Sequence, residues 1–270
     1  MLRIFPLFLL LCCTAAVDAA PAIDTIAGRQ LESLTLRHAT SPDVIVFENG
    51  SRATLDHWGT VPERMAQEAS VFAYNRPGYG KSEVAATPRD GRSVVEELRA
   101  ALHAKGLPPP YVLVGHSLGG LYMQLFAHAY PHEVKALVLV DALYPRMVKK
   151  VEDFPWMTRI AGQLALSRTV WREIEQIDAM GETILALPEI GDMPVLRLEN
   201  QPVSKTAIAV DFGAFRMDQT TRDSVRRLYP QAIRVVADSS HQMALTSPDI
   251  VAAAIRQMLA LPGETALAGQ

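Results

Sequence analysis

The chain has 270 residues, of which 49% are hydrophobic and 20% charged, a composition typical of a globular protein that buries a large core. Its formal net charge is −3 and it contains no block of basic residues, which argues against nucleic acid or an anionic membrane as a partner. The sequence has no internal repeat, no low-complexity tract and no clustered metal ligands, so we expect neither a bound metal nor another cofactor.

The N-terminus has the pattern of a secretory signal. Arg3 supplies a basic start, residues 4–13 are apolar, and Val17 and Ala19 are small residues of the kind that signal peptidase needs. This pattern predicts a signal peptide over residues 1–19 and an exported protein, periplasmic or secreted. The apolar run is too short to span a bilayer comfortably, and no later run is comparable, so we expect no stable membrane span after cleavage.

Both cysteines, Cys12 and Cys13, fall inside this segment, so the mature chain is expected to form no disulfide. A lipid anchor on either cysteine is the alternative, although Leu11 is not the small residue that such processing prefers.

After the signal, apolar runs that predict strands alternate with helical patterns. The predicted strands are Val44 to Phe47, Val71 to Tyr74, Val112 to Val114, Ala136 to Val140, Pro194 to Leu198 and Ala232 to Val236. The helical patterns are Leu55 to Ala69, Val94 to Ala104, Leu121 to Tyr130 and Pro248 to Leu261. Gln30 to Arg37 alternates and is more polar, which predicts an edge strand. Such alternation indicates an α/β fold with a mostly parallel central sheet and helices on both faces.

The rhythm changes between Tyr144 and Ile190, where helical patterns follow one another without strands. We predict a helical lid insertion over residues 144–190, between core segments 20–143 and 191–262, and a flexible tail over residues 263–270. Candidate apolar walls of a pocket under the lid are Trp156, Met157, Ile160, Leu164 and Trp171. Their helical spacing favours packing of the lid onto the core for most of them.

The most informative motif is Gly115-His116-Ser117-Leu118-Gly119, which directly follows an apolar run and directly precedes a helical pattern. This is the layout of a nucleophile elbow, a turn so sharp that only small neighbours fit beside the serine. Ser117 is therefore the predicted nucleophile. The alternative is a glycine-rich strand-helix turn with no chemical role.

A nucleophilic serine needs a base, and the chain has seven histidines. His241 is the predicted base because it follows the last predicted strand in the loop Asp238-Ser239-Ser240-His241. His116 adjoins the serine, but the elbow turn directs its side chain away from the hydroxyl, which favours a packing role. The remaining histidines have polar neighbours and are predicted to be solvated surface residues: His38, His57, His103, His128 and His132.

Several segments together resemble the α/β-hydrolase superfamily over nearly all of the mature length. They are Val44 to Ser51 with Trp58 beyond it; Tyr74 followed by Asn75-Arg76-Pro77-Gly78-Tyr79-Gly80-Lys81-Ser82; the elbow with Pro131 and Leu137 to Asp141; and, more loosely, His241 with Ser247-Pro248-Asp249. The glycines of the second segment do not have phosphate-loop spacing, and in the resembled family this segment is a structural turn.

The resemblance implies an oxyanion hole made of two backbone amides, which map onto Leu118 and Ser51. The family usually has a histidine before the loop glycine, and this chain has Asn49 there. Arg52 is a further departure. It is either a ligand for a substrate carboxylate or phosphate, or a solvated loop arginine.

The carboxylate that orients the base is the least determined member of the triad. The resembled family most often places it a few residues after the penultimate strand, where this chain offers only Glu199, which comes too early, and then Asp211. The alternative place is the end of the preceding strand, where Asp141 stands. We predict Asp141 as the acid, against Glu199, Asp211 or another acid, and a cap on the following turn is its competing role.

These residues predict an exported serine hydrolase that acts through an acyl-enzyme on Ser117, with no cofactor, and the resemblance implies a carboxylic ester of a small molecule as its substrate. Alternatives on the same scaffold are an aminopeptidase, a thioesterase, a lactonase or a perhydrolase; an acidic patch from Glu173 and Glu175 would favour the peptidase. A non-catalytic binding protein is a further alternative, supported by the missing aspartate after the penultimate strand.

Overall fold

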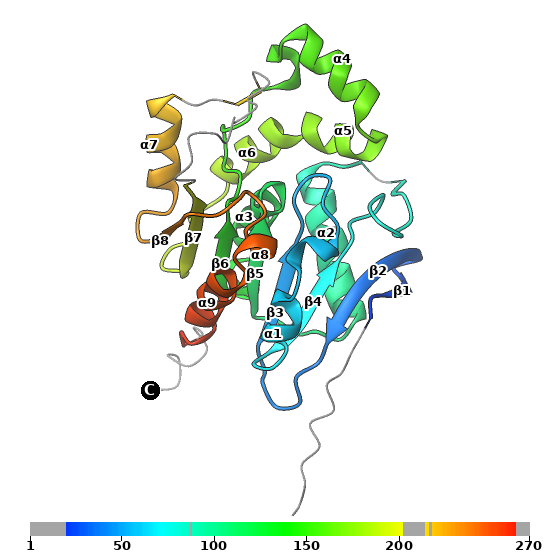
Figure 1. Cartoon of the computed structure of the whole chain (residues 1–270), viewed down its shortest axis with the longest axis vertical. Coiled ribbons are helices and arrows are strands. Elements are labelled where there is room, and N and C mark those ends of the chain that lie inside the picture. The colour runs from blue at the N-terminus through cyan, green and yellow to red at the C-terminus, as the bar shows by residue number, and fades with distance from the viewer. Residues whose placement is uncertain (1–19, 87, 202–213, 216–217, 263–270) are drawn as a thin grey trace, which may run out of the picture.

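The computed structural model describes residues 20–86, 88–201, 214–215 and 218–262 and is built around one eight-stranded sheet (Figure 1). The strands are β1 (Ala22–Ile26), β2 (Arg29–Leu36), β3 (Val44–Glu48), β4 (Ser70–Tyr74), β5 (Tyr111–His116), β6 (Val134–Val140), β7 (Val195–Asn200) and β8 (Ile233–Ala237). Their order is β1-β2-β4-β3-β5-β6-β7-β8. β1 and β2 pair antiparallel, β2 joins β4 antiparallel, and the other pairs are parallel. The predicted signal peptide, the predicted tail and Asp211 lie outside the described residues.

Helices flank the sheet on both faces. Those of the described residues are η1 (Leu55–Trp58), α1 (Val61–Met65), α2 (Gly91–Ala104), α3 (Leu118–Ala129), η2 (Pro131–Glu133), η3 (Val151–Asp153), α4 (Trp156–Ala165), α5 (Arg168–Glu175), α6 (Ile177–Ala186), α7 (Gln219–Leu228), α8 (Met243–Thr246) and α9 (Pro248–Leu259). In Figure 1, α1 and α9 lie in front of the sheet, and α2 and α3 lie behind it.

The alternation of side chains along the buried strands explains this layering. In β3, Val44 and Val46 enter the core shared with α2 and α3, whereas Ile45 and Phe47 enter the core shared with α1 and α9. All four side chains are buried, as in a parallel sheet covered on both sides. The predicted α/β-hydrolase fold class is therefore confirmed.

Two element predictions are wrong. The segment Gln30 to Arg37 forms β2, but β2 is not an edge strand, because β1 pairs outside it through a two-residue hairpin. Ala27 and Gly28 both have positive φ, at 49° and 77°, as such a tight turn requires. The helical pattern Leu55 to Ala69 is two short helices, because Gly59 interrupts it with φ 55°.

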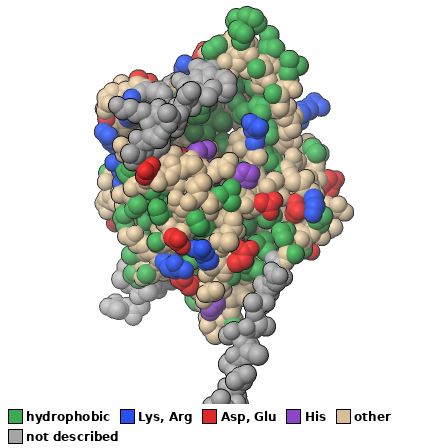
Figure 2. Space-filling model, viewed as in Figure 1, with side chains coloured by type: hydrophobic (Ala, Val, Ile, Leu, Met, Phe, Trp, Pro, Cys, Tyr) green, Lys and Arg blue, Asp and Glu red, His purple; other side chains and the backbone are tan. Residues whose placement is uncertain are grey.

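Residues 144–190 contain α4, α5 and α6, which leave the sheet after β6 and return to it before β7. In Figure 1, α4 and α5 lie above the sheet at the top of the view. The expectation that most of the apolar residues listed for this segment pack onto the core is wrong. Four of them are exposed: Trp156, Met157, Ile160 and Leu164. Figure 2 shows hydrophobic side chains gathered on this uppermost part of the molecule.

The physical reason is that α4 packs on α5 rather than on the core. Trp171 of α5 lies against Gly162 of α4, where an added Cβ would come within 2.3 Å of the indole ring. No residue of α4 is buried. The apolar stripe of α4 therefore remains on the outside of the insertion.

Candidate active site

Ser117 occupies a strained turn between β5 and α3. Its backbone has φ 53° and ψ −120°, which a residue with a side chain rarely adopts. A Cβ added at Gly115 would lie 2.6 Å from the Cα of Gly120, and one added at Gly119 would lie 2.2 Å from the carbonyl oxygen of Glu48. The glycines of the motif are thus required by close backbone approach, as a nucleophile elbow demands.

The elbow is fastened to the end of the neighbouring strand β6. The Ser117 N–H donates to the carbonyl of Val140 (3.2 Å), and the Ser117 carbonyl accepts from the N–H groups of Gly120 (3.0 Å) and Leu143 (2.9 Å). Leu118 is the first residue of α3, directly after the serine. These bonds hold the elbow next to Asp141, the residue that follows Val140.

Asp141 lies in hydrogen-bond contact with His241. The carboxylate Oδ2 is 2.7 Å from His241 Nδ1, and Oδ1 accepts from the N–H of Asn200 (3.2 Å). The Asp141 N–H donates to the carbonyl of Leu198 (2.7 Å), so β7 holds the backbone and the side chain of Asp141 alike. Because an ionised carboxylate can only accept, Nδ1 carries the proton and Nε2 of the neutral ring is an acceptor.

Glu199, the other candidate acid that the structure describes, is paired with arginines rather than with His241. Glu199 forms ion pairs with Arg234 (2.7 Å) and Arg197 (2.9 Å). Asp211 lies outside the described residues. The acid at the end of β6, and not the one on β7, therefore contacts the predicted base.

His116 packs against the predicted base. Its ring centroid is 4.6 Å from that of His241, and its Nε2 lies 2.7 Å from the backbone carbonyl of His241. A carbonyl accepts, so Nε2 of His116 is the donor. Burial, reinforced by the charge of His241, lowers the pKa of His116 to about 4. His116 is therefore neutral near pH 7 and fastens the loop that carries His241.

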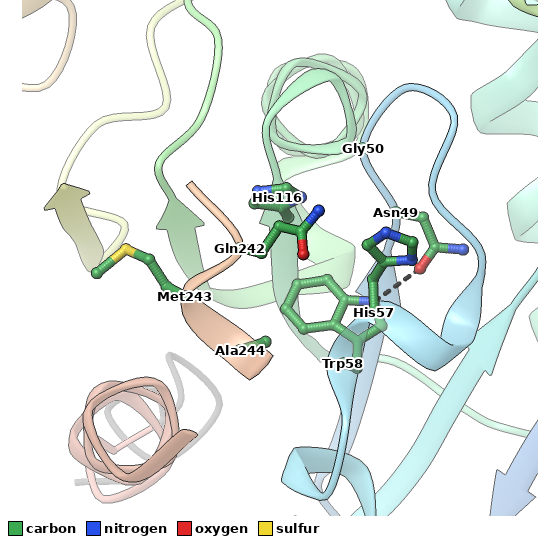
Figure 3. A pocket seen from close by; sticks show the side chains of 8 residues that line it. All are labelled: Asn49, Gly50, His57, Trp58, His116, Gln242, Met243 and Ala244. Atoms are coloured by element: carbon green, nitrogen blue, oxygen red, sulfur yellow. Dashed lines mark hydrogen bonds between the residues drawn. The ribbon is translucent and has the colours of Figure 1, made fainter. Parts of the chain in front are cut away.

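A small cavity of about 10 Å³ lies beside His116 (Figure 3). It is lined by Asn49, Gly50, His57, Trp58, His116, Gln242, Met243 and Ala244. His57 is half-buried here, so its predicted solvated position is wrong. The dashed line in Figure 3 is the bond that Trp58 Nε1 donates to Asn49 Oδ1 (2.7 Å).

His128 is a second histidine whose predicted solvated position is wrong. Only 6% of it is exposed, because α3 is covered on both sides. Its Nδ1 lies 2.8 Å from the Pro188 carbonyl, and its Nε2 lies 3.2 Å from the hydroxyl of Tyr229. His38 is half-buried like His57, so its predicted solvated position is wrong as well, and it accepts two backbone N–H groups of its own loop. His103 and His132 are exposed.

The loop after β3 lies against the elbow. A Cβ added at Gly50 would be 3.2 Å from the Ser117 Cβ. Asn49, at the position where the resembled family has histidine, is buried and holds the base of the loop. Besides the bond from Trp58, its Nδ2 donates to the Tyr74 carbonyl (2.7 Å). Ser51 follows Gly50 in this loop, and Arg52 beyond it is exposed with φ 61°.

Sequence reasoning missed the role of Arg76. The segment that contains it is a turn, as predicted, in which the Tyr79 N–H donates to the Arg76 carbonyl (2.9 Å). The Arg76 side chain is in addition buried against the loop after β3 and pairs with Glu48 and Glu173. A glutamate at the end of a fully buried strand was the available signal, since such a charge needs a partner. The acidic patch expected for an aminopeptidase does not form, because Glu173 is fully buried and only Glu175 is exposed.

The described part of the chain contains no group of three or more histidine, cysteine, aspartate or glutamate side chains able to hold a metal ion. Nor does any helix in that part combine the length and hydropathy needed to cross a membrane.

Comparisons with known proteins agree with this architecture. A family model described as alpha/beta hydrolase fold matches residues 43–167. The uncharacterized protein YqjL of Bacillus subtilis is 28% identical over 225 residues, covering 81% of this chain and 84% of that protein. A pimeloyl-[acyl-carrier protein] methyl ester esterase of Chromobacterium violaceum is 34% identical over 153 residues, covering 56% of this chain and 54% of that protein.

The structure of lip1 from Acinetobacter baumannii AYE superposes with a TM-score of 0.69 at 18% identity, covering 90% of this chain and 92% of that one. Some relatives are longer than the matched region: the match with YbdG of Bacillus subtilis spans 34% of that protein.

Proposed function

Since the chain belongs to the α/β-hydrolase superfamily, we propose that it is a serine hydrolase that cleaves a carboxylic ester of a small molecule through an acyl-enzyme on Ser117. The observation that carries the proposal is the 2.7 Å contact between His241 Nδ1 and Asp141. The loop that carries His241 is held beside the elbow by the hydrogen bond from His116 Nε2 to the His241 carbonyl. The contact with Asp141 leaves His241 Nε2 free to accept a proton.

The first half of the reaction forms the acyl-enzyme. His241 Nε2 takes the proton of the Ser117 hydroxyl as Oγ attacks the ester carbonyl, and Asp141 stabilises the imidazolium that results. The N–H groups of Leu118 and Ser51 hold the oxyanion of the tetrahedral intermediate. When that intermediate collapses, the ester C–O bond breaks and His241 returns its proton to the leaving alcohol.

The second half releases the acid. His241 accepts a proton from water, the hydroxide attacks the acyl carbon, and the proton returns to Ser117 Oγ as the carboxylic acid departs. Helices α4, α5 and α6 shape the acyl pocket as a lid in this proposal. Export, through the signal expected at residues 1–19, is part of the same proposal.

An ester rather than another acyl substrate is proposed by analogy with the methyl ester esterase relative, an analogy that goes no further than the reaction class. The alternative of a non-catalytic binding protein rests on the lack of an aspartate after the penultimate strand. The contact of Asp141 with His241 weakens that alternative, because an acid at the end of β6 can take the same role. The burial of Glu173 removes half of the acidic patch that favoured an aminopeptidase.

Labelling of the purified protein with a fluorophosphonate probe tests the proposal, with Ser117→Ala and His241→Ala as controls and the adduct located by peptide mass spectrometry. We expect a single adduct on Ser117 that both substitutions abolish, and turnover of p-nitrophenyl esters that follows the labelling. A folded wild-type protein that acquires no adduct would contradict it.

A further inference from the structure

A buried ion cluster joins the helical insertion to the loop after β3. We call it the Arg76 cluster and define it as Glu48, Arg76, Tyr79, Arg89 and Glu173. Arg76 is 1% exposed and the side chains of Glu48 and Glu173 are fully buried. Glu173 lies on α5, so one end of the cluster belongs to the insertion, and Glu48 ends β3, so the other end belongs to the sheet.

Arg76 uses all of its donors. Nη1 donates to Glu48 Oε1 (2.6 Å) and to the Asn49 carbonyl (2.5 Å), and Nη2 donates to the Gly50 carbonyl (3.0 Å). The remaining donors serve Glu173, with Nη2 at 3.1 Å from Oε2 and Nε at 3.2 Å from Oε1. The planar guanidinium therefore cannot rotate without losing an acceptor.

The Gly50 carbonyl accepts from Arg76 (3.0 Å) and, at a longer distance, from the Ala53 N–H (3.4 Å), and the shorter bond from Arg76 sets the direction of the next amide. In a trans peptide the C=O and the following N–H point in opposite directions. With its carbonyl held by Arg76, the peptide between Gly50 and Ser51 directs the Ser51 N–H away from the Arg76 cluster. Gly50 itself lies against Ser117, so the orientation of this peptide decides whether the Ser51 N–H can meet an oxyanion.

Glu173 holds Arg76 from the opposite side. Besides the two bonds from Arg76, it accepts from the hydroxyl of Tyr79 (2.6 Å) and from Arg89 (3.4 Å). Burial raises the pKa of Tyr79 to about 12, so that hydroxyl stays a donor at neutral pH. Each Glu173 oxygen thus accepts from two donors, an arrangement that only a carboxylate can satisfy.

We infer that Glu173 is a positioning residue for the oxyanion hole: from helix α5 it fixes Arg76, and Arg76 fixes the peptide between Gly50 and Ser51. The inference rests on the proposed function, since it assigns a role within that reaction. As a consequence, the position of helix α5 on the core and the orientation of the Ser51 N–H are coupled, and a change in one changes the other.

Glu173→Gln is the test, because the amide keeps the shape of the side chain but replaces one acceptor oxygen with a donor. The readouts are kcat and KM for a p-nitrophenyl ester, and the ratio of inhibition constants for a methyl ketone and its trifluoromethyl analogue. Ser117 Oγ adds to the trifluoromethyl ketone, the carbonyl electron pair becomes an oxyanion, and His241 takes the hydroxyl proton. The ratio of the two inhibition constants therefore measures how strongly the oxyanion hole stabilises the negative charge of the adduct.

We expect kcat to fall by about 10- to 100-fold, less than the loss of a whole oxyanion donor, with KM little changed. The trifluoromethyl ketone should lose its advantage over the methyl ketone by the same factor. A Glu173 that only anchors α5 would lower Tm and leave this ratio at the wild-type value, which would overturn the inference.

Lys135→Met is the matched control. Lys135 pairs with Asp43 at 2.9 Å and is 9% exposed, but it stands at the start of β6, at the opposite end of the sheet from Ser117. Both substitutions should lower Tm, and only Glu173→Gln should lower the inhibitor ratio. If Lys135→Met lowered the ratio equally, the ratio would follow the overall loss of stability rather than the oxyanion hole, and the inference would fail.

A double-mutant cycle tests the route through Arg76. In an Arg76→Lys background, Glu173→Gln should lower the inhibitor ratio no further, whereas independent effects on the ratio would multiply and refute the route. If Glu173→Gln does not fold, Tyr79→Phe removes a single donor from Glu173 and should shift the ratio in the same direction by a few-fold. No shift in that variant would likewise overturn the inference.

The two proposals fail in different ways. A wild-type protein that takes no fluorophosphonate label refutes the serine hydrolase and the inference with it. A wild-type protein that is labelled and turns over esters, together with an unchanged inhibitor ratio in Glu173→Gln, refutes the inference alone.

Discussion

Replacing Asp141 with asparagine should stop turnover because the structure leaves the new amide only one good orientation. In the wild-type protein, Oδ1 accepts from the Asn200 N–H and Oδ2 accepts from His241 Nδ1. Asparagine has one acceptor oxygen and one NH2 donor. If its oxygen keeps the bond from Asn200, its NH2 faces His241 and Nδ1 must become the acceptor.

That change moves the proton of the neutral imidazole to Nε2, the atom that accepts the proton of Ser117 in the proposed mechanism. The opposite orientation of the amide would set the NH2 against the Asn200 N–H, donor against donor. We therefore expect kcat to fall by about 10⁴-fold, the size of the effect when a triad carboxylate becomes an amide. This corresponds to about 5 kcal/mol of transition-state stabilisation.

Steady-state hydrolysis of a p-nitrophenyl ester measures this effect, with circular dichroism and Tm as checks of the fold. Glu199→Gln is the matched control, since Glu199 lies on β7 in ion pairs with arginines and does not meet His241. It should change kcat by no more than about 3-fold, the size expected of a surface charge change. An Asp141→Asn enzyme within tenfold of wild type would refute the assignment of Asp141 as the acid.

Three further predictions follow from burial and packing. The pKa of His116 is lowered to about 4, chiefly by burial, so between pH 6.5 and 4 the unfolded chain binds the proton and the free energy of unfolding falls as pH falls. Urea titrations at several pH values should show His116→Gln reducing this slope, by up to about 1.4 kcal/mol per pH unit, and an undiminished slope in that variant would contradict the assignment. Gly119→Ala places a Cβ 2.2 Å from a backbone carbonyl oxygen, so we expect it to cost at least about 1–3 kcal/mol in thermal unfolding and to abolish labelling of the serine; a stable, labelled variant would contradict the elbow geometry. Leu164→Ser on the exposed face of α4 should change the free energy of unfolding by less than about 0.5 kcal/mol, whereas Leu113→Ala in the core should cost about 2–5 kcal/mol; similar values for the two would contradict the burial described above.

Local pattern was enough to predict the elements that position the site. The buried strands β3, β5 and β6 each contain a run of at least four consecutive apolar residues because both of their faces are covered, and the sequence alone shows these runs. The elbow could be predicted equally well, because its glycines are required by close backbone contacts within a few residues of Ser117 or with the adjacent strand. The edge strand β1 was harder to predict, because it is short and three of its five residues are exposed, so its sequence has little apolar pattern.

The placement of the insertion could not be predicted. The apolar stripe of α4 has the spacing of a helix that packs onto a core, and the same stripe would suit a helix that keeps it outside. Gly162 and Trp171 decide between the two, because their contact seats α4 on α5. That contact depends on how two helices cross, which periodicity along one helix does not encode.

The fold class, the elbow with Ser117 and the candidate base His241 follow from the amino-acid sequence alone, since each depends on residues close together in the chain. Which acid contacts His241, and which side chains hold the loop after β3, depend on the three-dimensional fold. Asp141 contacts a histidine 100 residues away, and Arg76 contacts a glutamate 97 residues away. The order of the strands in the sheet brings Asp141 and His241 together, and the position of α5 on the core brings Glu173 to Arg76. Charge interactions and hydrogen bonds act between groups that are close in space, and the position of a carboxylate in the sequence does not show which group the fold places beside it.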